Sequence, residues 1–412
     1  MLKRIAAIVF IFVCTAVAWM VLGTSVGVRS RMQDEKLKRV VGQIWGAPQR
    51  QKAPEVYYKT TREVEVKTAS DGKTTTETKT QTMTHRLDLQ ASHIEVDLGL
   101  EYRRKGLLWY SAYRVGFSGA YDVLNNTGEA RDVFVAFAFP NKQAVYDDFK
   151  VTVDGKEIRD VRLNDGSVVQ KVRLEPGQRA EVAFSYRSQG MDEWWYDFGT
   201  SVSQVKDFSL KMSTDFDGFD FPQNGISPTS KEPAGKGWAL RWDYRNLLSG
   251  VQIGIALPQR LNPGPWVSRV TFSAPVSLFL FFFLLFVITV RTGVKVHPMN
   301  FFFLGAAFFS FHLLLAYLAD HVSIHAAFLI ASAVSIFLVV SYMRVVCGTR
   351  FALVQVGLSQ FVYLVLFSYT FFFEEFTGLA VTALCISTLF VVMQYTARVD
   401  WERAFGGKKE GE

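Results

Sequence analysis

The strongest constraint on this chain of 412 residues is the clustering of its apolar residues into six long segments that contain no Asp, Glu, Lys or Arg. A helix needs about 20 residues to cross the ~30 Å hydrocarbon core of a bilayer. Backbone polar groups in lipid must be satisfied within the segment, which favours helices. We therefore predict one N-terminal transmembrane helix and a C-terminal bundle of five. The segments are residues 5–28, 270–290, 299–319, 326–343, 351–373 and 377–397.

The basic residues orient these helices. Outside residues 31–266 there are 12 Lys and Arg residues, and ten of them fall on one side if the helices alternate in direction. The short connections on the other side, 320–325 and 374–376, contain no Lys or Arg. Connections rich in Lys and Arg stay in the cytoplasm. We expect a multi-pass protein of the bacterial inner membrane, with both termini cytoplasmic and residues 31–266 exported.

The first segment has an alternative interpretation as a cleaved signal peptide. Its apolar core is longer than the ~7–15 residues typical of such peptides. The small residues that follow it, Gly23-Thr24-Ser25, lack the preferred Ala. We therefore expect an uncleaved anchor, although cleavage would leave the later topology unchanged.

Charge and cysteine content limit what the exported region does. It holds 33 basic and 31 acidic residues, so the pI of 9.1 reflects the cytoplasmic flanks rather than a nucleic-acid-binding surface. The cysteines, Cys14, Cys347 and Cys385, lie in or beside membrane segments. The exported region therefore has no disulfide, and its core depends on burial alone.

The chain divides into five predicted parts: a transmembrane helix (1–30), a helical linker (31–54), a β-rich periplasmic domain (55–266), a five-helix transmembrane domain (267–401) and a cytoplasmic tail (402–412). Within the β-rich part, residues 56–67 and 74–89 flank Asp71-Gly72, a hairpin turn pair. About nine further short segments alternate apolar and polar residues. They favour an antiparallel, sandwich-like domain, with 218–237 as a Pro-containing loop.

Motifs for chemistry are weak. Gly23–Gly27 spells GxSxG, but it closes a membrane helix and lacks the strand-to-helix context of a nucleophile elbow. Asp215, Asp217 and Asp220 resemble a loose calcium loop without its terminal Glu, so a solvated turn is the better interpretation. The sequence 194–196, Trp-Trp-Tyr, is more typical of a core or a bilayer-facing surface than of a sugar or lipid site. We predict no catalytic residue, cofactor or metal.

Polar residues in or beside the spans are costly in lipid unless they are paired, which makes them candidates for function. In a bundle they would form a proton or cation site near the outer face. The alternative is interhelical hydrogen bonding for the mid-helix histidine, and solvated loop ends for the rest. The candidates are His312, Asp320, His321, His325, Glu374 and Glu375.

Several stretches resemble the CreD family of inner-membrane proteins. They are Val296-His297-Pro298-Met299-Asn300, residues 313–321 (LLLAYLADH), residues 395–401 (YTARVDW), and Ile44-Trp45-Gly46 with Gln49. The order of one helix, a large external domain and an apolar C-terminal block is also similar. The resemblance implies a role in cell-envelope integrity and in the response to cell-wall-active agents. It implies no catalytic residues.

The leading functional hypothesis is a non-enzymatic envelope protein whose exported domain contacts an envelope or cell-wall component or a periplasmic protein, with the lipid bilayer as its other partner. The second is a transporter or lipid-handling protein that uses the five-helix block, which would be expected to show inverted repeats or broken helices. A membrane-embedded hydrolase is third, because no convergent acid or histidine cluster can be assembled.

Overall fold

The computed structural model describes residues 2–70, 73–106, 108–142, 144–161, 163–164, 166–198, 203–373 and 375–397. It contains two compact units. The first, called the helical unit here, is Met1–Lys36 with Leu261–Glu412. The second, called the β unit, is Leu37–Arg260. Helix α1 (Leu2–Trp45) contributes residues to both.

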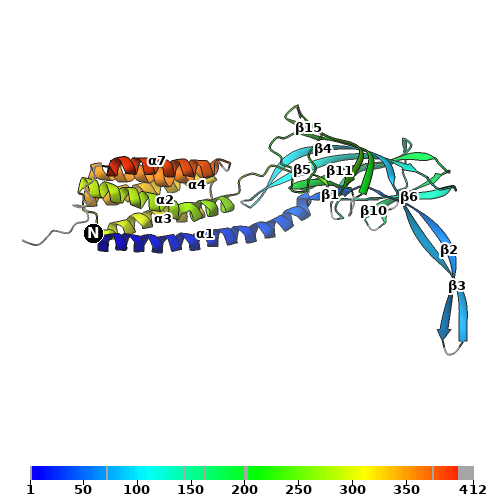
Figure 1. Cartoon of the computed structure of the whole chain (residues 1–412), viewed down its shortest axis with the longest axis horizontal. Helices are drawn as coiled ribbons and strands as arrows, with labels where there is room; N and C mark the ends of the chain where they lie inside the picture. Colours follow the sequence, from blue (N-terminus) through cyan, green and yellow to red (C-terminus); the bar gives the residue numbers. More distant parts are fainter. Residues whose placement is uncertain are drawn as a thin grey trace, which may run out of the picture. The chain divides into compact units, whose positions relative to one another are not determined.

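The helical unit consists of apolar helices that lie side by side (Figure 1). Six helices in the described part of the chain are long and apolar enough to cross a membrane. Pro opens two of them, where its missing N–H costs no hydrogen bond. The spans after α1 are α2 (Pro263–Thr292), α3 (Pro298–Leu318), α4 (Ile324–Cys347), the segment Phe351–Phe372 and α7 (Thr377–Thr396).

The fifth span is not a regular α-helix. It contains two π-helical stretches, in which each N–H reaches one residue further back along the chain than in an α-helix. Its successive parts are η1 (Phe351–Gly357), α5 (Leu358–Gln360), η2 (Phe361–Leu366), α6 (Phe367–Tyr369) and η3 (Thr370–Phe372).

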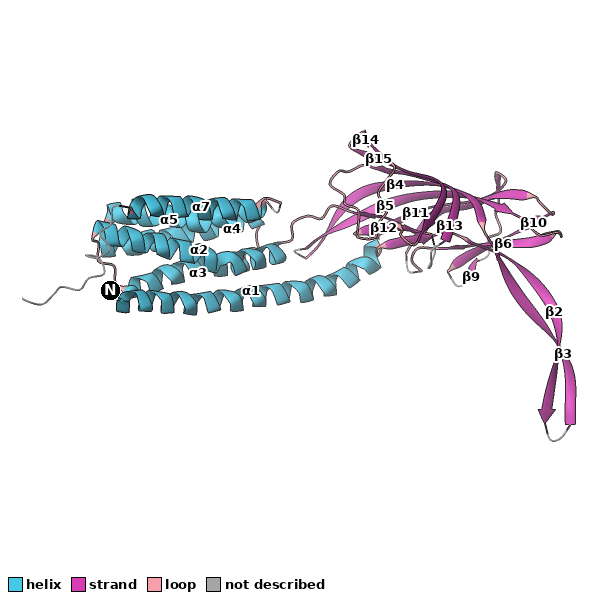
Figure 2. Ribbon diagram, in the orientation of Figure 1, coloured by secondary structure: helices cyan, strands magenta, loops and turns pink. Residues whose placement is uncertain are grey.

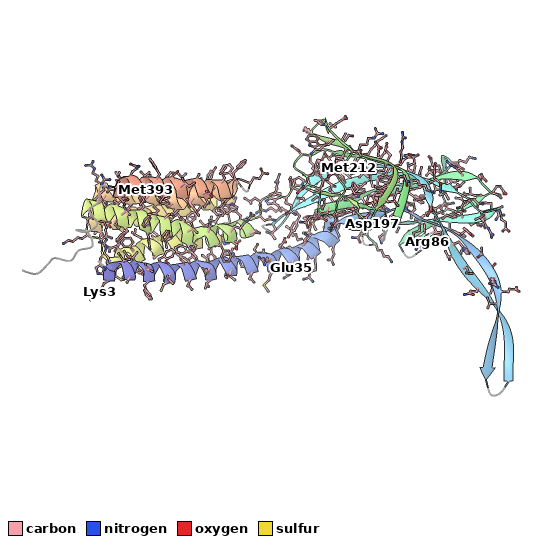
Figure 3. All side chains as sticks on the ribbon, viewed as in Figure 1. Lys3, Glu35, Arg86, Asp197, Met212 and Met393 are labelled. Carbon is pink, nitrogen blue, oxygen red and sulfur yellow. The ribbon has the colours of Figure 1, made fainter. Side chains whose placement is uncertain are left out.

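Contacts at the helix ends show that α2 and α7 run in the same direction, and that α1 and α3 do so as well. At one end, the Arg291 guanidinium lies 4.4 Å from the ring centroid of Tyr395, which joins the C-terminal ends of α2 and α7. At the opposite end, Arg29 Nη2 and Asp320 Oδ2 form an ion pair of 2.8 Å. Lys3 lies near the start of the first span and Met393 near the end of the last. Figure 3 shows both toward the same end of the helical unit.

The β unit is built from three sheets (Figure 2). The largest has eight strands in the order β14-β15-β13-β4-β5-β11-β7-β8, the second has the order β3-β2-β6-β10-β9, and the third β1-β12-β16. The strands are β1 (Gln49–Lys52), β2 (Glu55–Ser70), β3 (Lys73–Leu87), β4 (Leu89–Lys105), β5 (Leu108–Leu124), β6 (Arg131–Ala138), β7 (Tyr146–Val153), β8 (Lys156–Glu157), β9 (Leu163–Asn164), β10 (Ser167–Leu174), β11 (Arg179–Met191), β12 (Glu193–Asp197), β13 (Ser203–Thr214), β14 (Ser230–Ala234), β15 (Gly237–Ser249) and β16 (Ile253–Ala256).

One hydrophobic core joins these sheets into a sandwich. Phe184 of the eight-stranded sheet stacks on Phe137 of the five-stranded sheet, with ring centroids 4.5 Å apart. Trp194 and Tyr196 of the three-stranded sheet are fully buried in the same core. This burial agrees with the interpretation of 194–196 as core. The expected β-rich middle domain between apolar helices is therefore present.

Two details differ from the sequence prediction. The pairs β4–β13 and β1–β12 are parallel, so the sheets are not purely antiparallel. Residues 218–237, expected to be a loop, contain the strand β14. This strand lies at the edge of its sheet, where Pro233 is tolerated although it has no N–H to donate.

Two other predicted segments also differ. The stretch 31–54, expected to be a helical linker, is helical only to Trp45 and then forms β1. The expected hairpin is present as the long ribbon of β2 and β3 seen in Figure 2, and its Asp71-Gly72 turn lies outside the described residues.

Candidate functional site

The outer face of the eight-stranded sheet is the most distinctive polar surface of the β unit. Alternate residues of a strand point to opposite faces. In β4, Ile94, Val96 and Leu98 are buried in the core, whereas Glu95 and Asp97 face outward. The same alternation runs through β5, β11 and β13. The face opposite the core therefore carries charged side chains on neighbouring strands.

A cleft of about 940 Å³ opens on this face. Its walls combine strands β4, β5, β7, β11 and β13 with the end of α1. Gly99 and Gly116 form part of the lining, and their missing side chains leave space between the charged groups. The charged residues of the lining are Asp97, Arg114, Asp147, Arg187 and Asp215.

Three of the charged residues in the lining have polar partners. Arg114 Nε lies 2.8 Å from Glu101 Oε1. Arg187 Nη1 lies 3.0 Å from Asp148 Oδ2. Asp215 Oδ1 accepts a 2.8 Å hydrogen bond from the backbone N–H of Leu100. Because these side chains are at least partly exposed, each ion pair contributes at most about 1 kcal/mol to stability.

Three smaller hollows continue from the cleft across the same face. They have volumes of about 270, 400 and 510 Å³. Asp97 lines the cleft and the hollows of about 270 and 400 Å³. Lys211 lines the hollows of about 400 and 510 Å³. The polar face therefore forms one extended surface of alternating basic and acidic groups rather than a single closed pocket.

Buried tyrosines support the floor of the cleft. The Tyr113 hydroxyl accepts a hydrogen bond from the backbone N–H of Gln49 at 3.2 Å and donates one to the Glu193 carbonyl at 2.9 Å. Burial raises the pKa of Tyr113 well above its usual value. Burial also raises the pKa of Tyr146, which lines the cleft, to about 12. Both phenols are therefore neutral at physiological pH, and they act as fixed hydrogen-bonding groups.

The mid-helix candidate of the sequence, His312, is fully buried in the helical unit. Its Nδ1 lies 3.2 Å from the Phe308 carbonyl oxygen within the same helix. The imidazole is enclosed by the rings of Trp19, Phe308 and Phe311. Its Nε2 has no hydrogen-bond partner in the described part of the chain.

The other candidates lie at the helix ends. Asp320 is paired with Arg29, and the exposed His325 stacks on Phe372 with ring centroids 4.8 Å apart. His321 and Glu375 are exposed. Glu374 lies outside the described residues. A shared proton or cation site on these residues stays a prediction. Among the described residues, no group of three His, Cys, Asp or Glu side chains is arranged to hold a metal ion.

The acidic cluster 215–220 takes part in turns. Asp217 Oδ1 accepts hydrogen bonds from Trp238 Nε1 at 2.9 Å and from the Gly218 N–H at 2.8 Å. Asp220 Oδ1 accepts one from the Phe221 N–H at 2.7 Å. These carboxylates are used to hold the backbone, which agrees with the interpretation as a turn.

Sequence reasoning missed most of the cleft residues. Arg114 and Arg187 lie on separate strands and carry no motif, whereas Asp215, directly after β13, was considered only as part of the acidic cluster 215–220. The available signal was the alternation itself, because charged residues recur at every second position of strands whose other positions are apolar. That signal identifies an exposed face but does not indicate where the face is hollow.

These features define an integral membrane protein that combines six candidate spanning helices with a large β-rich unit. The family model "Inner membrane protein CreD" matches residues 245–402. This region includes the five C-terminal spans, and the resemblance to the CreD family noted in the sequence is confirmed there.

Comparisons with other proteins are distant. A search of characterised proteins found no match to the chain. A structure of a putative nutrient binding protein from Legionella pneumophila is 12% identical, covers 46% of this chain and 72% of its own, and has a TM-score of 0.30. An M1 zinc metallopeptidase from Deinococcus radiodurans is 9% identical, covers 41% of this chain and 42% of its own, and has a TM-score of 0.24. Likenesses at these TM-scores carry no functional argument.

Proposed function

We propose that this inner-membrane protein holds both chain termini in the cytoplasm and its β unit on the opposite side of the membrane. Support comes from the basic residues in the connections between spans. Arg4 contacts Thr289 at 3.3 Å, so the N-terminal end of α1 lies beside the C-terminal end of α2. Arg291 lies at that same end. The arginine-poor connections lie at the other end, which by the positive-inside rule faces outward.

We further propose that the β unit binds a component of the cell envelope and thereby supports envelope integrity, without catalysing a reaction. The observation that carries this proposal is the continuous hollowed surface on the eight-stranded sheet. A pocket for a small ligand is usually closed and mostly apolar. This surface is open and long, and charged side chains lie among the apolar ones that line it, which suits an extended polymer or a protein surface better.

Its charge pattern narrows the ligand class. Arg114 and Arg187 are interleaved with Asp97, Asp147 and Asp215 along the cleft. Such a pattern complements a ligand that carries both amino and carboxylate groups, and it repels a uniformly charged polymer. We therefore infer that the ligand is an extended envelope component of mixed charge, such as a peptide-bearing polymer or a polar protein segment.

The test uses the full chain in cells. A photo-crosslinking residue would replace Ser118, an exposed residue that lines one of the hollows. We expect it to capture an envelope component. The same residue at Glu157, which is exposed and lines neither the cleft nor the three hollows, is the matched control position. Equal capture at both positions, or no capture at Ser118, would overturn the proposed binding surface.

A second variant tests the cleft itself. A Cβ atom at Gly116 would meet Asp97 only at ordinary contact distances of 3.8 Å and more, so Gly116→Ala is tolerated and serves as the control. Gly116→Phe would occupy the cleft. We expect Gly116→Phe to abolish crosslinking from Ser118 and to fail to complement a deletion strain exposed to cell-wall-active agents. Full complementation by Gly116→Phe would contradict the proposal.

The second candidate function, transport or lipid handling, has one observation in its favour. The π-helical fifth span carries Gln360, which is fully buried and donates from Nε2 to Ser335 Oγ at 2.8 Å. Its Oε1 has no partner among the described residues. A buried polar group in a distorted membrane helix is a feature of substrate pathways. This alternative would be favoured if a stable Gln360→Leu protein failed to complement the deletion strain while the Gly116→Phe protein complemented it fully.

A further inference from the structure

Both covalent connections of the β unit to the membrane spans leave it at the end of the β4–β5 hairpin where Lys105 pairs with Leu108. Leu37 packs against the small hydrophobic cluster that contains Leu108. Its Cδ1 lies 3.8 Å from the place that a Cβ atom on Gly106 would occupy. At the other connection, the Arg260 guanidinium lies 4.1 Å from the ring centroid of Tyr102 and 4.6 Å from that of Trp109. One end of one hairpin therefore receives both links.

Short covalent links join this end of the hairpin to the first two membrane spans. Only two residues separate Arg260 from Pro263, the first residue of α2. Three residue steps span at most about 11 Å. On the other side, α1 is continuous from the apolar segment that ends at Val28 to Leu37, a rise of about 14 Å. These two covalent links limit how far the hairpin end can lie from the ends of the first two spans.

The hairpin end is basic and aromatic. We call the group Tyr102, Arg103, Arg104, Lys105, Trp109 and Arg260 the hairpin-end patch. Arg103 is paired with Glu101. Within the described ranges, Arg104, Lys105 and Arg260 have no carboxylate at ion-pair distance, and Arg104 and Arg260 are exposed. The region 31–266 as a whole is nearly neutral, so this excess of positive charge is local.

We propose that the hairpin-end patch binds anionic phospholipid headgroups of the leaflet that faces the β unit. Arginine forks form paired hydrogen bonds with phosphate oxygens. Tyr and Trp rings favour the headgroup layer because they combine an apolar body with a polar edge. Basic residues near an anionic surface each strengthen the attraction. This inference does not depend on the polar cleft or on its ligand.

The experiment uses the full chain in lipid nanodiscs. Cys14, Cys347 and Cys385 are replaced by Ser, and a nitroxide label is attached through Gln259→Cys, at an exposed position next to Arg260. The distal label is Glu157→Cys, also exposed. Through the strand pairings, Glu157 is level with Ala120 of β5, twelve residues and therefore about 40 Å from the hairpin end. Nickel-chelating lipid headgroups then report the proximity of each label to the surface.

In nanodiscs of phosphatidylcholine with phosphatidylglycerol, we expect the nickel lipids to enhance the relaxation rate of the nitroxide at position 259 several-fold more than that of the nitroxide at position 157. Without phosphatidylglycerol, or at high salt, the rise should shrink, because the attraction is electrostatic. Loss of one basic residue near an anionic surface weakens binding about fivefold. The triple variant Arg104→Gln/Lys105→Gln/Arg260→Gln should therefore lose most of the lipid-dependent rise.

The control triple variant, Arg159→Gln/Arg179→Gln/Lys236→Gln, removes the same charge from exposed positions elsewhere in the β unit. It should keep the rise. The variant Arg104→Lys/Arg260→Lys, which preserves charge, should also retain most of it and shows that a loss is not caused by misfolding. Relaxation at 259 that is independent of phosphatidylglycerol, or equal to that at 157, would overturn the proposal.

Discussion

The indole of Trp19 and the imidazole of His312 meet edge to face inside the helical unit, with ring centroids 5.7 Å apart and an interplanar angle of 88°. Both side chains are fully buried. Trp19 Nε1 and His312 Nε2 each lack a hydrogen-bond partner in the described residues. The contact between α1 and α3 therefore depends on aromatic packing rather than on a hydrogen bond between these two side chains.

This packing predicts different outcomes for two substitutions. Trp19→Ala leaves a large cavity and should lower the stability of the helical unit by about 3 kcal/mol or more. His312→Phe keeps an aromatic ring and removes an unpaired polar nitrogen, so it should be neutral or stabilising. Thermal unfolding in detergent measures both, and Val17→Ala at an exposed position of α1 is the control. A large loss of stability with His312→Phe would instead show that Nε2 has a polar partner in the membrane.

Two glycines at the end of α1 provide a matched pair. Gly46 has a φ of +95°, and a Cβ atom there would lie 2.2 Å from the Gln189 carbonyl oxygen. Gly46→Ala should cost about 1–3 kcal/mol through the backbone conformation alone, and the close contact adds to this cost. Gly42 is helical, and its Cβ would meet Ala47 only at 3.9 Å. Gly42→Ala should therefore be neutral or stabilise the protein by up to about 1 kcal/mol.

The measurement is the midpoint of chemical unfolding of each variant in the same detergent, followed by tryptophan fluorescence. Because Gly46 lines the cleft, a destabilised Gly46→Ala protein should also lose crosslinking from Ser118, which lines an adjoining hollow. Equal stability of the two alanine variants would refute the close approach of the chain at Gly46.

Asp217 predicts a pH dependence of stability. The hydrogen bond from Trp238, followed by that from the Gly218 N–H, lowers the pKa of this carboxyl below its usual value. A carboxyl with a lowered folded-state pKa stabilises the fold above its unfolded pKa of about 3.9 and loses that contribution as the pH falls through the folded value. The melting temperature of Asp217→Asn should therefore lie below that of the wild type at neutral pH, and the gap should close in acid.

Removal of the donor tests the cause. Trp238→Phe eliminates the indole N–H, so in this background the Asp217→Asn substitution should lower the melting temperature by less at neutral pH. If the effect of Asp217→Asn is unchanged in the Trp238→Phe background, the indole does not set the pKa of Asp217.

The sequence was most informative where the surroundings impose one requirement over a long stretch. A membrane span must be long and almost free of charge, so residues 299–319 predict α3 (Pro298–Leu318) within two residues. Strand alternation was also reliable where a strand has one buried face, as in β10 (Ser167–Leu174). In both cases a local pattern reports a uniform environment.

Features that depend on distant partners were not predictable. Strand β1 has the polar sequence Gln-Arg-Gln-Lys, and its place in the sheet depends on parallel pairing with β12, more than 140 residues away. The stack of Arg260 on Tyr102 and Trp109 joins positions about as far apart. No local periodicity records such pairings, because loop closure brings together residues whose neighbours in sequence are unrelated.

The buried pair Gln360 and Ser335 separates a structural role from a transport role in the helical unit. Gln360 Nε2 donates to Ser335 Oγ at 2.8 Å, and Ser335 Oγ donates to the Ala307 carbonyl oxygen at 2.6 Å, so the chain of hydrogen bonds links the fifth span, α4 and α3. Interhelical hydrogen bonds of this kind in membranes are worth about 0.6 kcal/mol each. A double-mutant cycle of Gln360→Leu and Ser335→Ala should therefore give a coupling energy near that value, measured by thermal unfolding in nanodiscs. If the two side chains only join helices, Gln360→Leu should also complement a deletion strain fully, because leucine fills the same volume. A stable Gln360→Leu protein that does not complement would show that the unpartnered amide oxygen serves a substrate instead.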